Sequence, residues 1–179
     1  RLCACVLTRL CVLISRMARW IHRFTRQQAK QQQQRKLLYV EERFELVVEG
    51  VKFVGVWDRV DTDAADPAQV IITDYKSGMN GGKALTPSKA RDSNQLRLYA
   101  FAYERLKNVR PVRVQLESIE GGQVHGFTPT DADNERALEL IRCVRDAVTA
   151  GRFDAQPEIC MCRNCSYRMI CPFSLYKWM

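Results

Sequence analysis

The chain has 179 residues, of which 46% are hydrophobic and 27% are charged, a composition typical of one globular domain rather than a disordered chain. The net charge of +8 is concentrated in residues 1–40, which carry seven Arg, two Lys and no acid, so the remaining residues sum to −1. The basic character therefore belongs to the leading segment and not to the body of the chain.

Residues 1–36 are predicted to form a basic helical arm or connector. The apolar stretch from Leu2 to Ile14 is interrupted by Arg9 and is too short to span a bilayer, so we expect no membrane segment. It also lacks the form of a signal peptide. We favour a connector from an upstream domain, since the chain begins at Arg1 rather than Met; the alternatives are an arm that contacts phosphates and an organellar transit segment.

Alternation and turn residues predict the order of elements along the rest of the chain. The glutamines between positions 27 and 34 are expected to be a solvated helix end or linker. The Gly- and Pro-containing segment 77–90 is expected to be a mobile loop, whose neighbouring cations either contact a nucleic-acid backbone or are simply solvated. Helices are predicted over about residues 5–35, 93–107 and 131–150, and strands over 37–49, 51–61, 69–76, 111–120 and 123–128.

Two acidic residues follow apolar, β-branched runs. Asp74 and Lys76 are two apart, so they project from the same face of the third strand. Asp58 ends the run of the second strand, and antiparallel pairing would bring Asp58 within a few ångströms of Asp74. Paired carboxylates beside a cation suit a Mg²⁺ or Mn²⁺ site that acts on a phosphodiester. An Asp-x-Lys pair alone is also typical of a solvated strand end.

Gln95 and Tyr99 lie four residues apart on the helix that begins after Ser93, so they share a face. One interpretation is that Tyr99 is a core aromatic residue. In the other interpretation the pair faces Asp74 and Lys76 and positions Lys76 and the substrate strand.

The eight cysteines include four within twelve residues: Cys160, Cys162, Cys165 and Cys171. A disulfide framework is not expected in a chain that otherwise has the features of an intracellular protein. Closely spaced thiolates favour a metal, either tetrahedral zinc or an iron–sulfur cluster. We expect such a centre to clamp the C-terminal tail in a structural role.

Over about residues 41–172 the chain resembles the PD-(D/E)XK nuclease superfamily, in its RecB/AddB-like branch, often found as the C-terminal domain of UvrD-type helicases. The motifs that carry the resemblance are Gly55-x-x-Asp58-Arg59, Asp74-Tyr75-Lys76, Gln95-x3-Tyr99 and Cys162-x2-Cys165-x5-Cys171-Pro172. They occur in the order of the family's second, third and fourth motifs and its three-cysteine tail.

The resemblance implies an α/β fold: a restriction-endonuclease-like core with a mixed central sheet flanked by helices, and a cysteine-stapled C-terminal tail. It divides the chain into the arm (1–36), the nuclease core (37–155) and a metal-binding tail (156–179). The implied function is a Mg²⁺-dependent deoxyribonuclease of DNA repair or recombination, within a helicase–nuclease that is cytoplasmic and nucleoid-associated, or organellar or nuclear in a eukaryote. The alternative is a catalytically silent or zinc-stapled DNA-binding module.

The resemblance also implies roles for single residues. Asp58 and Asp74 would bind one or two Mg²⁺ or Mn²⁺ ions, with the main-chain carbonyl of Tyr75 as a further ligand. Lys76 would orient the attacking water or neutralise developing negative charge, while Gln95 and Tyr99 position it. DNA and a helicase domain or subunit are the implied partners; since the chain lacks a Gly-x4-Gly-Lys-Ser/Thr loop, any helicase motor is expected outside it.

A [4Fe–4S] cluster is the cofactor that the resemblance implies for the tail. Cys162, Cys165 and Cys171 would be ligands, with a fourth cysteine from upstream, for which Cys11 is nearest to the core. Cys160 offers a local alternative that would suit zinc. The family often adds a His or Glu metal ligand on the leading helix, but the surroundings of His22 match that motif poorly, and we expect a surface histidine.

Overall fold

The computed structural model describes the backbone of residues 4–32, 34–77 and 84–176, and the side chains of residues 11–31, 34–77 and 84–176. The chain divides into two compact units, Arg1–Ile141 and Arg142–Met179. The first unit contains the sheet and its helices, and the second contains the cysteine-rich segment. The domain boundaries predicted at residues 36 and 155 stay a prediction.

Five strands form one mixed sheet, as predicted, and their order in the sheet is β1-β2-β3-β4-β5. Neighbouring strands are antiparallel except β3 and β4, which are parallel and are therefore joined by a helical crossover. The elements are α1 (Ala4–Gln32), β1 (Arg35–Val48), β2 (Val51–Asp63), β3 (Val70–Lys76), α2 (Pro87–Arg91), α3 (Asn94–Lys107), β4 (Arg113–Ser118), β5 (Val124–Phe127), α4 (Asp131–Thr149) and α5 (Ile159–Asn164).

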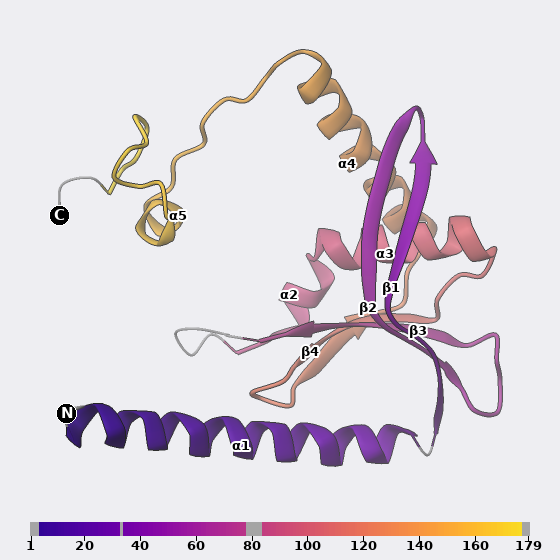
Figure 1. Cartoon of the computed structure of the whole chain (residues 1–179). Coiled ribbons are helices and arrows are strands. Elements are labelled where there is room, and N and C mark those ends of the chain that lie inside the picture. The colour runs from indigo at the N-terminus through magenta and orange to yellow at the C-terminus, as the bar shows by residue number, and fades with distance from the viewer. Residues whose placement is uncertain (1–3, 33, 78–83, 177–179) are drawn as a thin grey trace. The chain divides into compact units, whose positions relative to one another are not determined.

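Helix α1 extends over 29 residues and belongs to the first unit. Figure 1 shows α1 on one side of the sheet and α2 and α3 on the other. Across the described ranges of the chain, no helix combines the length and the apolar character that crossing a bilayer requires.

The sheet face toward α3 is apolar and forms the main core. Val70 and Ile72 of β3 alternate with residues that face the other way, as do Val114 and Leu116 of β4. They pack with Leu96 and other residues of α3. Burial of this face fixes the register of the strands, because a shift of one residue would turn the apolar side chains away from the core.

The sheet face toward α1 is buried but polar. Arg59 donates to both carboxylate oxygens of Asp61 at 2.9 and 2.7 Å and to Oε1 of Gln28 at 2.7 Å. Gln28 and Gln27 donate to Oε1 of Glu117 at 3.0 and 3.2 Å. The prediction of solvated glutamines is wrong for Gln28, which is only 8% exposed. Buried charges require such hydrogen-bond partners, and an amide supplies both a donor and an acceptor.

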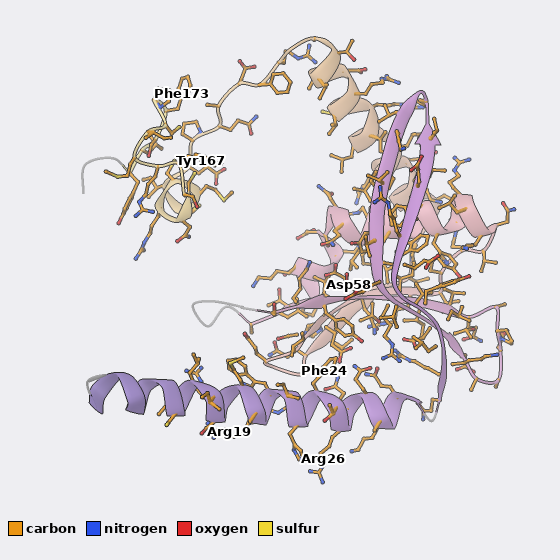
Figure 2. The ribbon with its side chains drawn as sticks, viewed as in Figure 1. Arg19, Phe24, Arg26, Asp58, Tyr167 and Phe173 are labelled. Atoms are coloured by element: carbon orange, nitrogen blue, oxygen red, sulfur yellow. The ribbon has the colours of Figure 1, made fainter. Side chains whose placement is uncertain are left out.

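The β1–β2 hairpin turns away from the plane of the other strands (Figure 1), and Asp58 lies near this bend (Figure 2). In the β1–β2 register Glu41 lies opposite Asp58, and it adopts a left-handed φ of 49°. Gly55 lies beneath the ring of Phe44, where an added Cβ would meet Cζ at 2.4 Å. The ring of Phe44 in turn stacks on Trp57, with centroids 4.3 Å apart. This glycine therefore allows the aromatic packing that supports the strand before Asp58.

The expected loop over residues 77–90 ends earlier than predicted, because α2 begins at Pro87. The hydroxyl of Thr86 accepts from the main-chain N–H of Lys89 at 3.3 Å, and Pro87 occupies the first turn, where its missing N–H costs nothing. Residues 78–83 lie outside the described residues, so the predicted contact of this loop with a nucleic-acid backbone stays a prediction.

Asp133 joins the start of α4 to α2 and α3. Its carboxylate is 1% exposed and accepts from Arg91 at 2.7 Å, from Arg97 at 3.3 Å, and from both the N–H and the hydroxyl of Thr130 at 3.0 and 2.8 Å. Burial by itself raises the pKa of Asp133, but the hydrogen bonds from Thr130 and Arg91 outweigh it and hold the pKa below its ordinary value.

We expect Asp133→Asn to lower the free energy of unfolding at neutral pH by about 3 kcal/mol, because two guanidinium groups lose their charged partner. Since the folded state depresses this pKa, the stabilisation is present above the ordinary value of 3.8 and is lost as the pH falls through the lower folded value. Urea unfolding of both proteins at neutral and acidic pH measures the difference. Asp92→Asn, at an exposed position, is the control. A difference that does not shrink in acid would contradict the assignment.

Candidate active site

Asp58 and Asp74 come from neighbouring antiparallel strands. The register pairs Arg59 of β2 with Thr73 of β3, which sets Asp58 beside Asp74. Oδ2 of Asp58 accepts a hydrogen bond from the main-chain N–H of Tyr75 at 2.9 Å. Strand β2 continues to Asp63, two residues beyond the predicted end at residue 61. The carboxylate of Asp58 is presented where the hairpin turns away from the sheet.

Lys76 contacts both Asp74 and Gln95. Its Nζ lies 2.6 Å from Oδ2 of Asp74 and donates to Oε1 of Gln95 at 2.8 Å. The amide of Gln95 also donates to Oδ1 of Asp74 at 2.6 Å. Asp74, Lys76 and Gln95 therefore each contact the other two. Asp74 and Lys76 share a strand face, and Gln95 reaches them from the first turn of α3, which Ser93 caps as predicted.

Tyr99 extends this arrangement by one helical turn. Its hydroxyl accepts from Nε2 of Gln95 at 2.8 Å, while its ring packs edge-on against Phe44. Both interpretations of Tyr99 therefore apply: its ring packs with the core aromatic residues, and its hydroxyl belongs to the site. Burial raises the pKa of Tyr99, and the charges of Asp74 and Asp58 raise it further against the opposing hydrogen bond from Gln95. The phenol therefore stays neutral at neutral pH.

Asp74 is more deeply buried than Asp58 or Lys76. The side chain of Asp74 is 2% exposed, whereas that of Lys76 is 36% exposed and opens the site to solvent. Burial raises the pKa of Asp74, contact with Lys76 opposes this rise, and the neighbouring charge of Asp58 adds to it. A cation beside both carboxylates would relieve their mutual repulsion.

The donor atoms present suit a small, hard cation. Oδ2 of Asp74 is buried and accepts no hydrogen bond of normal geometry from the described residues, although Lys76 is close to it. Among those residues no group of three or more His, Cys, Asp or Glu side chains gathers as a metal site. Two carboxylates nevertheless match the way Mg²⁺ is usually held, with several waters retained.

Tyr75 directs its side chain away from this site. Its ring packs edge-on against Phe24 of α1, with centroids 5.3 Å apart, and Figure 2 shows Phe24 pointing from α1 toward the sheet. Burial raises the pKa of Tyr75, and Arg59 opposes the rise. Only the main chain of Tyr75 is therefore suitably placed to act with Asp58 and Asp74.

His22 is not brought to the two carboxylates. It is exposed on α1 and lines a surface hollow together with Arg19 and Arg26. The expectation of a surface histidine matches this position.

The four tail cysteines line one hollow of about 460 Å³ within the second unit. Cys160 and Cys162 lie on α5, and Cys165 ends that helix. All four are unpaired as disulfides, yet the described residues show no group of three gathered as metal ligands, so the cysteines do not fit a cluster as they are arranged here. Cys11 is exposed on α1, in the first unit.

Sequence reasoning missed the polar network beneath the site. Arg59 was noted only as part of a motif, yet it binds Asp61 and Gln28 on the α1 side of the sheet. Arg59 and Asp61 alternate within β2, and Gln115 and Glu117 alternate in the same way within β4. This period-two pattern of polar residues in otherwise buried strands was the available signal.

Comparisons with known proteins give one family match for this chain. The chain matches the family model described as the PD-(D/E)XK nuclease superfamily over residues 6–172, a range that contains Asp58, Asp74, Lys76 and Gln95. No curated protein matches it. Among solved structures it is similar to the crystal structure of SSO0001, at 16% identity and a TM-score of 0.47, over 76% of this chain and 61% of that chain. This chain thus spans less than two thirds of that protein. From the match over residues 6–172, the chain belongs to the PD-(D/E)XK nuclease superfamily.

Proposed function

We propose that this chain is a metal-dependent DNA nuclease that hydrolyses phosphodiester bonds. The observation that carries the proposal is the position of the Lys76 ammonium, which lies between Asp74 and Gln95 and is partly open to solvent. A second carboxylate, Asp58, lies on the adjacent strand. Carboxylates beside a fixed cation are the groups that hydrolysis of a phosphodiester requires.

Asp58 and Asp74 would hold Mg²⁺ or Mn²⁺, with the main-chain carbonyl of Tyr75 as a third ligand. When bound, such an ion lowers the pKa of a coordinated water and stabilises charge on the phosphate. The raised pKa of Asp74 and the repulsion from Asp58 support a cation at this position.

Lys76 would act on the attacking water or on a phosphate oxygen. An ammonium group has three N–H donors. One of them is used by Gln95, and the ammonium also forms an ion pair with Asp74. Because Lys76 is partly exposed, its remaining donor capacity would be available to a substrate phosphate or water.

Gln95 and Tyr99 are positioning residues in this proposal. The carbonyl of Gln95 accepts from Lys76, while its amide donates to Asp74 and to Tyr99. This polarity fits one orientation of the amide only, so Gln95 holds the lysine and the carboxylate at a fixed separation. Trp57 supports the same helix by donating to the main-chain carbonyl of Tyr99 at 3.3 Å.

The wider setting is proposed from the resemblance alone: DNA repair or recombination, with a helicase domain or subunit as partner. The alternative function is a catalytically silent or zinc-stapled DNA-binding module. The hydrogen-bonded set of Asp74, Lys76 and Gln95 favours the enzyme, because a binding module has no physical need for it.

The tail is proposed to hold a structural metal centre, a [4Fe–4S] cluster or alternatively zinc. Cys162, Cys165 and Cys171 would be ligands, together with Cys11 or Cys160. The support is that the four tail cysteines line one hollow. Binding would require these side chains to move closer together than they lie here.

We expect Lys76→Ala and Asp74→Ala each to lower the rate of Mg²⁺-dependent DNA cleavage by about a thousand-fold, because each removes a charge from the reacting centre. Lys52→Ala is the matched control, since Lys52 is an exposed lysine on the β1–β2 hairpin that pairs only with Glu45 in the described contacts. Cleavage of single- and double-stranded DNA by anaerobically purified protein measures the effect. A fully active Lys76→Ala protein would refute the assignment, and a folded but inactive wild type would favour the binding module.

We expect anaerobically purified protein to contain iron and sulfide, and Cys162→Ser and Cys171→Ser to lose that metal. Cys143→Ser is the control, because Cys143 is exposed and lies outside the hollow. Comparing Cys11→Ser with Cys160→Ser identifies the fourth ligand. Bound zinc instead of iron would support the alternative centre, and protein without either metal would contradict both.

A further inference from the structure

Five cations form a stripe along the outward face of α1. They are spaced three or four residues apart, so they lie above one another on one side of the helix, and all are exposed. At a rise of 1.5 Å per residue the stripe is about 21 Å long. We call it the α1 basic stripe; its members are Arg16, Arg19, Arg23, Arg26 and Lys30.

In the C-terminal half of the helix the opposite side is occupied by the sheet, whereas Met17 and Ile21 on the same side of the N-terminal half are exposed. Phe24 packs on Tyr75, and Gln28 is buried between Arg59 and Glu117. Figure 2 shows Phe24 directed toward the sheet, whereas Arg19 and Arg26 point away from it. The fold therefore fixes which side of α1 faces outward, and that side carries the cations.

The charge of the stripe is not balanced within the unit. Residues 1–40 contain no acid, and in the described part of the chain no carboxylate forms an ion pair with Arg19, Arg26 or Lys30. Arg23 donates only to a main-chain carbonyl, that of Glu120. A surface hollow of about 710 Å³ runs along the helix and is lined mainly by these cations and His22. Closely spaced, unneutralised guanidinium groups suit a row of phosphates.

We propose that the α1 basic stripe binds the phosphate backbone of duplex DNA. The inference rests on the proposed function, which supplies a polyanionic substrate of matching charge. Because α1 and α3 lie on opposite sides of the sheet, the stripe is separate from the contact of Lys76 with Gln95 (Figure 1). It would hold a part of the DNA that is distant from the bond being cleaved.

A membrane surface fits this helix less well than DNA does. A helix that binds a bilayer inserts its apolar side between the lipids. Behind Arg26 and Lys30 that side is used by Phe24 and Gln28 against the sheet and is not free to insert. The exposed apolar residues Met17 and Ile21 lie further toward the N-terminus and do not extend behind these two cations. A nucleic-acid backbone needs only the outward cations.

The test compares two triple variants that remove equal charge from the first unit. One removes stripe cations, Arg19→Gln/Arg26→Gln/Lys30→Gln. The matched control removes exposed cations elsewhere, Lys36→Gln/Arg43→Gln/Arg136→Gln. Binding to a duplex of about 30 base pairs is measured by fluorescence anisotropy in EDTA over a series of salt concentrations. Cleavage of a short oligonucleotide is measured separately.

We expect the stripe variant to bind the long duplex at least about ten-fold more weakly, with a salt-dependence slope reduced by about two to three, since each phosphate contact contributes roughly 0.9. The control should bind like wild type, and both variants should cleave the short oligonucleotide at the wild-type rate. Equal weakening in both variants would overturn the proposal, because overall charge would then explain the binding.

Two further outcomes separate this proposal from its alternatives. Stripe-dependent binding to phosphatidylserine vesicles without binding to the duplex would overturn it in favour of a membrane surface. Stripe-dependent duplex binding by a wild type that does not cleave DNA would support the stripe while refuting the nuclease. A stripe variant that cleaves DNA and still binds the duplex as wild type does would overturn the stripe proposal and leave the proposed nuclease function intact.

Discussion

The antiparallel register between β2 and β3 is the constraint on which the candidate site depends. It pairs Val60 with Ile72 in the apolar core, and the same pairing places Asp58 beside Asp74. Because strand side chains alternate, a shift of one residue would bury Asp74 on the α1 side and separate it from Gln95. The hydrophobic core therefore fixes the chemistry as well as the fold.

The two faces of the sheet contribute differently to this site. The apolar face receives α3, and with it Gln95, which contacts both Asp74 and Lys76. The polar face receives α1 through hydrogen bonds of Gln28 with Arg59 and Glu117, which satisfy buried charges that would otherwise be costly. This polar network holds α1 against β2 and β4 on the sheet face opposite to α3. It thereby determines which side of α1 faces outward.

The sequence predicted those parts of the site that depend on local periodicity. Alternation placed Asp74 and Lys76 on one strand face, and a four-residue spacing placed Tyr99 beside Gln95. It did not predict the burial of Gln28, because that depends on a partner 89 residues away and a glutamine-rich stretch resembles a solvated linker. It did not predict the bend of the β1–β2 hairpin near Asp58, where Glu41 of the neighbouring strand adopts a left-handed φ. Cysteine spacing indicated a metal but could not choose between Cys11 and Cys160, because the choice depends on contacts distant in sequence.

The measurement that tests this site most directly is calorimetric titration with Mg²⁺ and Ca²⁺, hard cations for which thiolates are poor ligands. Wild type, Asp58→Asn and Asp74→Asn are compared with Asp63→Asn, which changes a carboxylate bound only within its own turn. One saturable binding event in wild type and the control, weakened at least about ten-fold in both other variants, is the predicted result. Equal binding by wild type and Asp74→Asn would contradict the assignment of this carboxylate pair as the metal site.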